Sequence, residues 1–336
     1  MALKLGILGI DHGHIFGMLA GMQAQGCTCA QYWTDGPAVT EAKFTQTHPG
    51  LTRADSADRI LDDPSIDMIL IAAVPADRAA LAIRAMEAGK DVMVDKPGCT
   101  TLDQLAALRA TQARTGRIWS VNFSERFQVP AVTRAEELVF GGAIGTVVQV
   151  LGLGPHKQNL ATRPDWFFQR NRYGGILTDI ASHQVDQFLW FTGSTTATVA
   201  HAAVQNTTRP DLPGFQDFGE MVLHSDRGRG YVRVDWFTAD GLPTWGDGRL
   251  FIQGTAGFVE LRKYTDIGRP HATNSLFLVN GTENRLIPCD DAGLPYFARL
   301  VADVQDRTET AMPQAHAFAT MEIAIRAQMM AEAPHA

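Results

Sequence analysis

Short apolar runs alternate with helix-like segments through the first 123 residues, and this alternation is the feature that most restricts the fold. The runs read LKLGILGI, CTCAQYW, DMILIAA, DVMVDKP and RIWSVNF. Between the third and the fourth, apolar residues recur at helical spacing, and Gly89 stands where a helix would end. Strands separated by helices in this way predict a doubly wound parallel sheet with helices on both faces.

The pattern changes after residue 123, which is where we expect a domain boundary. Segments such as ATVAHAAVQ, GYVRVDWFT and RLFIQGTAGFVELR predict mainly antiparallel strands joined by glycine turns. The last stretch, LPYFARLVADVQ and AHAFATMEIAIRAQMMAEA, returns to helical spacing. A chain of 336 residues exceeds the roughly 250–300 residues at which a single core stops growing. We therefore expect two domains, 1–123 and 124–336. The second would be α+β with a large, open-faced, mainly antiparallel sheet, and its last helices would pack back on the first domain.

Composition argues against several classes of protein. The formal charge of -7, with no clustered Lys and Arg, argues against nucleic-acid binding. No stretch approaches the roughly 18 consecutive apolar residues of a membrane span, and the start MALKLGILGI resembles no leader peptide, so we expect a cytoplasmic protein. Four scattered cysteines predict buried free thiols and give a poor zinc signal.

The stretch GILGIDHGHIFG, residues 6–17, follows the first predicted strand, where a dinucleotide-binding loop would carry G-x-G-x-x-G. Gly9 matches the first glycine, whereas Asp11 and His14 occupy the second and third positions. Three interpretations of the stretch are open. It is a modified nucleotide loop, a metal site formed by Asp11, His12 and His14, or a loop that binds another ligand. We expect no metal, because three side chains would have to converge from one tight turn with no further carboxylate nearby. Asp11 could instead cap a helix that begins near His12.

The loops after the parallel strands should meet at one crevice, because ligands of such sheets bind beyond the carboxyl ends of the strands. Thr34 and Asp35 stand near the position that contacts the cofactor ribose, and no Arg follows closely in sequence. This pattern favours NAD weakly and does not exclude NADP. The predicted cofactor-binding residues are Gly9, Asp11, His12, His14, Thr34, Asp35, Val74, Pro75, Asp95, Lys96 and Pro97.

The stretch GGILTDIASHQVD carries the strongest catalytic pattern. Asp179 and His183 are four residues apart, so on one helix they would share a face, with Asp186 near the same stripe. A carboxylate beside an imidazole orients its tautomer, as a general base requires. A surface ion pair is the alternative interpretation. Gly174 and Gly175, just upstream, suggest close backbone approach to a ligand.

Taken in order, the N-terminal strand-turn-helix, AGKDVMVDKP, GGAIGTVVQV and GGILTDIASHQVDQFLWFTG resemble the Gfo/Idh/MocA oxidoreductases over most of the chain. The resemblance implies a Rossmann first domain and a nicotinamide-dependent dehydrogenase of sugars, inositols or related polyols. The family's E-K-P signature matches Asp95, Lys96 and Pro97, with Asp in place of Glu. Its D-x-x-x-H matches Asp179 and His183, which implies that His183 exchanges the hydroxyl proton, tuned by Lys96 and Asp179. Tyr173 replaces the first of three usual glycines.

The loop PHKQNLATRPDWFF precedes the D-x-x-x-H segment and is expected to line the substrate pocket. The predicted substrate contacts are Asn122, His156, Arg163, Trp166, Asp179 and His183. The segment YVRVDWF predicts an apolar sheet face through which a homodimer or homotetramer would form. Two other functions stay open: a hydrolase or lyase that uses NAD transiently, and a non-catalytic relative with weakened cofactor binding.

Overall fold

The computed structural model describes residues 2–269 and 271–333, and its contacts divide the chain into two compact units. The first unit is built from Met1–Asn122, Thr162–Gly174 and Pro295–Met321. The second is built from Phe123–Ala161, Gly175–Leu294 and Glu322–Ala336. The chain therefore passes between the units several times, which a single predicted boundary near residue 123 does not describe.

The first unit contains a six-stranded parallel sheet in the order β3-β2-β1-β4-β5-β6. This order, which reverses direction beside β1, is the doubly wound topology expected from the sequence. The two-residue strand β3 was not foreseen. The strands are β1 (Lys4–Leu8), β2 (Thr28–Trp33), β3 (Thr52–Arg53), β4 (Met68–Ile71), β5 (Asp91–Asp95) and β6 (Trp119–Asn122).

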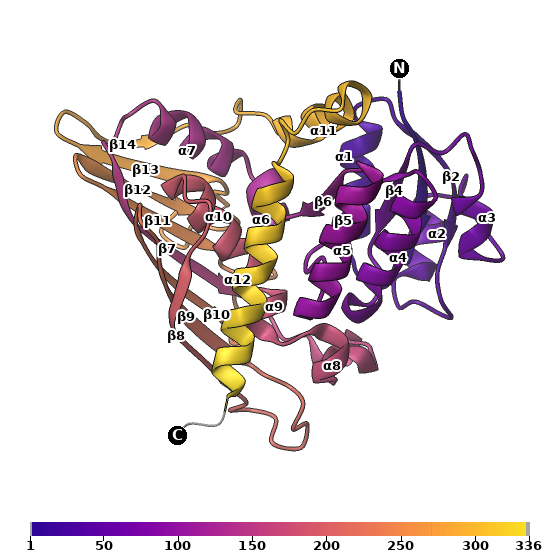
Figure 1. Cartoon of the computed structure of the whole chain (residues 1–336). Coiled ribbons are helices and arrows are strands. Elements are labelled where there is room, and N and C mark those ends of the chain that lie inside the picture. The colour runs from indigo at the N-terminus through magenta and orange to yellow at the C-terminus, as the bar shows by residue number, and fades with distance from the viewer. Residues whose placement is uncertain (1, 270, 334–336) are drawn as a thin grey trace. The chain divides into compact units, whose positions relative to one another are not determined.

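Helices follow the strands of this sheet, and α4 and α5 lie side by side (Figure 1). Thr101 caps α5 through its side chain, and Gly116 ends it in the left-handed conformation, as the sequence predicts. The Phe297 ring of α11 fills the space above Gly21 of α1. The helices that lie in this unit are α1 (His14–Gln23), α2 (Glu41–Thr47), α3 (Ala57–Leu61), α4 (Pro75–Glu87), α5 (Leu102–Thr115), α8 (Arg170–Tyr173) and α11 (Pro295–Asp306), with the short η2 (Asp165–Phe168).

The second unit contains an eight-stranded sheet in the order β14-β13-β12-β11-β7-β10-β9-β8. Neighbouring strands are antiparallel except β7 and β10, so the predicted mainly antiparallel sheet is confirmed. Its strands are β7 (Val147–Pro155), β8 (Thr198–Gln205), β9 (Phe218–His224), β10 (Arg229–Asp235), β11 (Arg249–Gly254), β12 (Gly257–Arg262), β13 (Ser275–Asn280) and β14 (Asn284–Ile287). Its helices are α6 (Ser124–Phe127), α7 (Pro130–Phe140), α9 (Ile176–Asp179) and α10 (Ser182–Thr192). Two further helices, η1 (Leu160–Thr162) and α12 (Gln314–Glu332), begin in one unit and end in the other.

One face of this sheet is covered by α7 and α10 (Figure 1), and the burial of β10 corrects one expectation. Val232 and Val234 are buried on the same side as Gly230, whose added Cβ would lie 2.9 Å from Phe188 of α10. The apolar face of YVRVDWF therefore packs inside this unit. On the opposite side, the Tyr231 hydroxyl donates to Glu220 over 2.8 Å.

Among the described residues, no helix combines the length and the apolar character needed to cross a membrane.

Candidate active site

The loop after β1 keeps one glycine that the backbone requires. Gly9 has φ +78°, and an added Cβ would lie 2.3 Å from the Cβ of Ala73. Helix α1 begins at His14, and its N-cap residue Gly13 makes no side-chain hydrogen bond to the first turn. The expected capping role of Asp11 is therefore wrong, because the helix begins later than the sequence suggested. The His14 amide donates to His12 Nδ1 over 3.4 Å, and the dipole at this helix N-terminus favours an anion such as phosphate.

Asp11 stands in this loop at the position of the second fingerprint glycine. Burial raises the pKa of Asp11 to about 6, against the opposing effect of Arg78. The carboxyl is thus less readily ionised than an exposed aspartate, which reduces its repulsion of a bound diphosphate near and below that pH.

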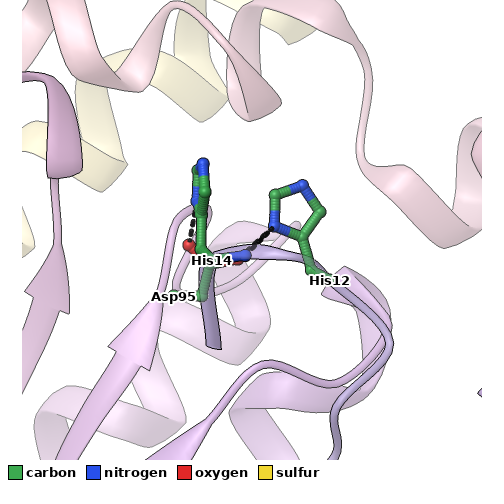
Figure 2. Close-up of side chains that lie close together, drawn as sticks. All are labelled: His12, His14 and Asp95. Carbon is green, nitrogen blue, oxygen red and sulfur yellow. Dashed lines mark hydrogen bonds and ion pairs between the residues drawn. The ribbon is translucent and has the colours of Figure 1, made fainter. Parts of the chain in front are cut away.

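The side chains of His12 and His14 converge on Asp95, at the end of β5 (Figure 2). His12 Nδ1 lies 2.9 Å from Asp95 Oδ2, and His14 Nδ1 lies 2.8 Å from Asp95 Oδ1. Burial alone would raise the pKa of Asp95, but His14, Arg78 and His12 hold it well below its usual range. Burial lowers the pKa of His12 to about 4 despite Asp95. The sequence had grouped the two histidines with Asp11; the structure groups them with Asp95, 81 residues beyond His14.

Arg78 of α4 is completely buried and ties the end of β5 to the end of β4, a role that sequence reasoning missed. Its Nε donates to the Ala73 carbonyl over 2.7 Å, and its Nη2 lies 3.0 Å from Asp95 Oδ2. Its Nη1 donates to the carbonyls of Asp95, Lys96 and Pro97. The available signal was a charged residue on the apolar stripe of α4 that contains Leu81 and Ala82.

The carboxyl end of β2 carries the predicted ribose contact. Thr34 is 1% exposed, and its Oγ1 has no hydrogen-bond partner among the described residues, whereas Asp35 is exposed. Pairing of β2 with β3 brings in Arg53, which donates to the Thr34 carbonyl over 3.1 Å. Its guanidinium also pairs with Glu41 at 3.1 Å. No arginine follows Thr34 closely in the sequence, but the fold brings Arg53 next to it, and Glu41 balances the charge of Arg53.

The remaining predicted cofactor residues lie at the ends of β4 and β5. Val74 precedes α4 and Pro75 is its first residue, a position where proline's missing N–H costs nothing. Lys96 and Pro97 follow β5 directly, and Lys96 is buried. Asn122, the last residue of β6, is buried and stands opposite Asp95 in the strand register.

In the second unit, Asp179 and His183 lie on two successive short helices instead of the single helix expected. Asp179 ends α9 and His183 is the second residue of α10. The Ser182 hydroxyl donates to the Asp179 carbonyl over 2.9 Å across the junction. Asp186, one turn further along α10, forms a buried bidentate ion pair with Arg126, with both distances 2.7 Å.

A buried charge cluster fixes the start of α10. Lys263 Nζ lies 2.7 Å from Glu125 Oε2, and Gln184 Nε2 donates to the same oxygen over 3.0 Å. Burial raises the pKa of Glu125, but Lys263, with His183 and His156, outweighs burial and holds it at about 2. This cluster, which sequence reasoning missed, links Gln184, the residue next to His183, through Glu125 to Lys263.

The predicted substrate loop is shared between the units. His156 belongs to the second unit, where its ring lies 4.5 Å from that of Trp245. Arg163 and Trp166 belong to the first unit, and the Arg163 guanidinium lies 4.3 Å above the Phe167 ring. A bidentate ion pair of Arg172 with Asp77, at 3.0 and 2.7 Å, holds this segment against α4.

The role expected for Gly175 is corrected by its surroundings. Gly175 has φ +88°, and an added Cβ would lie 2.2 Å from the side-chain amide carbon of Gln328. Gln328 Oε1 accepts a hydrogen bond from the Leu177 amide over 2.9 Å. Gly175 therefore makes room for a structural glutamine, and Gly174 closes α8 in the left-handed conformation.

Models of one protein family match both halves of the chain. The oxidoreductase family with an NAD-binding Rossmann fold matches residues 32–123, and the GFO/IDH/MocA C-terminal domain matches residues 132–260. The chain belongs to the Gfo/Idh/MocA oxidoreductase family. The parallel sheet of the first unit is thus an NAD-binding Rossmann fold, as the resemblance implied.

Individual relatives agree with this assignment. One solved structure is that of a protein from Erwinia carotovora atroseptica SCRI1043, which is named only as an oxidoreductase. Its sequence is 43% identical to this chain, and the two structures superpose with a TM-score of 0.95. The match covers 98% of this chain and 99% of that one. Levoglucosan dehydrogenase of Pseudarthrobacter phenanthrenivorans is 30% identical over 68% of this chain and 56% of its own length. scyllo-Inositol 2-dehydrogenase (NAD(+)) of Bacillus subtilis is 26% identical over 60% of this chain and 56% of its own length. The matches therefore span little more than half the length of these two curated relatives.

Proposed function

We propose that this protein is an NAD-dependent oxidoreductase that acts on a hydroxyl-bearing carbon of a sugar, inositol or related polyol. The observation that carries the proposal is the nucleotide loop of the Rossmann unit. The backbone at Gly9 requires a glycine, α1 begins directly after this loop, and Thr34 Oγ1 has no hydrogen-bond partner among the described residues. These features suit a dinucleotide, because the dipole at a helix N-terminus favours phosphate and the hydroxyl offers a ribose contact.

NAD is proposed over NADP because Arg53, the cation that donates to the Thr34 carbonyl, already has a carboxylate partner. A 2'-phosphate normally needs an arginine that is available to it. Arg53 pairs with Glu41 and donates to two backbone carbonyls, so its charge and donors are already engaged. A free 2'-hydroxyl requires no such cation.

The proton-handling residues are proposed from the family resemblance. The cofactor would supply the hydride acceptor or donor, and the protein would supply orientation and proton transfer. His183 would exchange the hydroxyl proton, Asp179 would orient its ring, and Lys96 would favour the ionised hydroxyl. Asn122, His156, Arg163 and Trp166 stay proposed substrate contacts.

A homo-oligomer is proposed to form through the face of the second sheet that α7 and α10 leave uncovered. YVRVDWF cannot supply its apolar centre, since Val232 and Val234 are buried within the unit. The apolar side chains that remain partly exposed on the strands include Leu151, Leu153, Phe251, Phe258 and Phe277. Such a face suits a second copy of the chain. A cytoplasmic location stays a prediction.

The test is calorimetric titration of nucleotide-stripped protein with NAD, NADH, NADP and NADPH, followed by NADH formation with scyllo-inositol, D-xylose and levoglucosan. We expect micromolar binding of NAD and NADH, weaker binding of the phosphorylated pair, and NADH formation with at least one member of a polyol panel. Product without net cofactor turnover would favour the hydrolase or lyase alternative. Absence of binding at millimolar nucleotide would favour the non-catalytic alternative.

Replacing Asp11 by asparagine should tighten NAD binding at pH 8. The change removes a negative charge from the loop position nearest the expected diphosphate while keeping the side-chain size. We expect the Kd to fall about tenfold, the effect of one screened charge repulsion of roughly 1.4 kcal/mol. Calorimetry of both proteins measures the change, with Asp306→Asn, at the end of α11, as a control for an exposed carboxylate. An unchanged Kd would mean that Asp11 faces away from the phosphates.

A further inference from the structure

Among the described residues, one group of side chains has the composition and spacing of a metal site: His12, His14 and Asp95. Each offers one ligand atom, and these atoms all lie within 4.8 Å of one another. The sequence argued against a metal because one tight turn supplied no further carboxylate. The fold removes that objection, since Asp95 arrives from the end of β5 and approaches both rings.

The three side chains differ in how far they are exposed. Both rings stand on the same side of Asp95 and direct Nδ1 toward its carboxylate (Figure 2). The carboxylate is fully buried, whereas the His12 and His14 side chains are 24% and 31% exposed. Three protein ligands with an open fourth position are typical of a site that also binds water or a ligand oxygen.

The distances require only small side-chain movements. Bonds of about 2.0–2.1 Å at the tetrahedral angle separate ligand atoms by about 3.3 Å. The two rings now contact different oxygens of Asp95, at 2.9 and 2.8 Å, and the ligand atoms lie within 4.8 Å of one another. An ion held by one of these oxygens therefore requires the rings to move until the separations approach about 3.3 Å, and both rings are partly exposed, one just before α1 and the other at its first residue.

Arg78 both supports and weakens such a site. Its contact with Asp95 Oδ2, at 3.0 Å, and its hydrogen bonds to the backbone fix the carboxylate, as supporting residues do around metal ligands. Its positive charge also opposes a cation, so we expect micromolar affinity instead of the tight binding of a structural zinc site. Two imidazoles and one carboxylate suit a divalent first-row transition ion better than Mg²⁺ or Ca²⁺, which prefer oxygen ligands alone.

We propose that His12, His14 and Asp95 form a binding site for a divalent transition metal ion, with Zn²⁺ as the representative ion. The ion is held by the two Nδ1 atoms and one Asp95 oxygen, and each neutral ring then carries its proton on Nε2. The site goes beyond the proposed oxidoreductase activity, and its three residues are also among those predicted to bind the cofactor.

The test is titration of the tag-free, nucleotide-stripped full chain with Zn²⁺ by calorimetry, and with Co²⁺ by visible absorption. We expect one ion per chain in the micromolar range, and a Co²⁺ spectrum of a four- or five-coordinate site without a thiolate charge-transfer band. His12→Ala and His14→Ala should each weaken Zn²⁺ binding by at least about tenfold, because each removes one of three ligands. Both rings are partly exposed, so these variants should fold. His201→Ala removes an exposed histidine of β8 and serves as the matched control.

Absence of Zn²⁺ binding at millimolar concentration would overturn the proposal, as would binding that both histidine variants leave unchanged. Titration of the same preparation with NAD keeps the two proposals separate. A protein that binds NAD without Zn²⁺ refutes the metal site alone, and one that binds Zn²⁺ at these histidines without NAD refutes the proposed cofactor alone.

Discussion

Arg78→Met will lower the free energy of unfolding by about 3–5 kcal/mol, because the change leaves a buried carboxylate without its cationic partner. Arg78 is fully buried, pairs with Asp95, and supplies donors to the carbonyls of Ala73, Asp95 and Pro97. Methionine fills much of the same volume but donates no hydrogen bond. Urea unfolding followed by fluorescence, with Trp119 in the same sheet as the natural probe, measures the loss.

Arg84→Met on the same helix is the matched control. Arg84 pairs with Asp58 at 2.5 Å, but both side chains are substantially exposed. Exposed ion pairs contribute at most about 1 kcal/mol, so this variant should stay close to the wild type. Equal stability of the two variants would show that Asp95 is neutralised without Arg78, and would contradict the role assigned to this arginine.

His183→Asn will reduce turnover by about 100- to 10,000-fold, the usual contribution of a positioned general acid or base. Asparagine keeps a polar side chain near the Phe123 ring but cannot exchange a proton near neutral pH. The residue lies in the second unit and the nucleotide loop lies in the first, so we expect the Kd for NAD to stay unchanged. Steady-state kinetics with a turned-over polyol and calorimetry with NAD measure the two effects.

A second substitution separates loss of chemistry from loss of structure. Gln184→Ala removes the amide that donates to Glu125, next to His183 in the chain, and leaves the imidazole in place. We expect this variant to lose stability and to retain most of the turnover of its folded fraction. Turnover in His183→Asn equal to that of the wild type would remove this histidine from the mechanism.

The periodicity of the sequence determined the architecture of both units. Apolar runs alternating with helical spacing specify parallel strands, and strict alternation after residue 195 specifies antiparallel ones, because side-chain periods of 3.6 and 2 are local properties of the chain. Single residues with local roles were equally predictable. Thr101 caps α5, Gly116 ends it, and Gly9 allows the turn after β1.

Only the tertiary structure decided which polar side chains meet. His12 and His14 contact Asp95, Arg53 reaches Thr34, and Lys263 pairs with Glu125, each across a long stretch of sequence. Sequence reasoning correctly predicted that the ends of β1, β2, β4 and β5 share one edge, since parallel strands impose this. It could not predict the pairing, because a charge is buried only where the whole fold supplies its partner. For the same reason Asp11, the carboxylate nearest in sequence, was the wrong partner for the two histidines, and Asp95 was the right one.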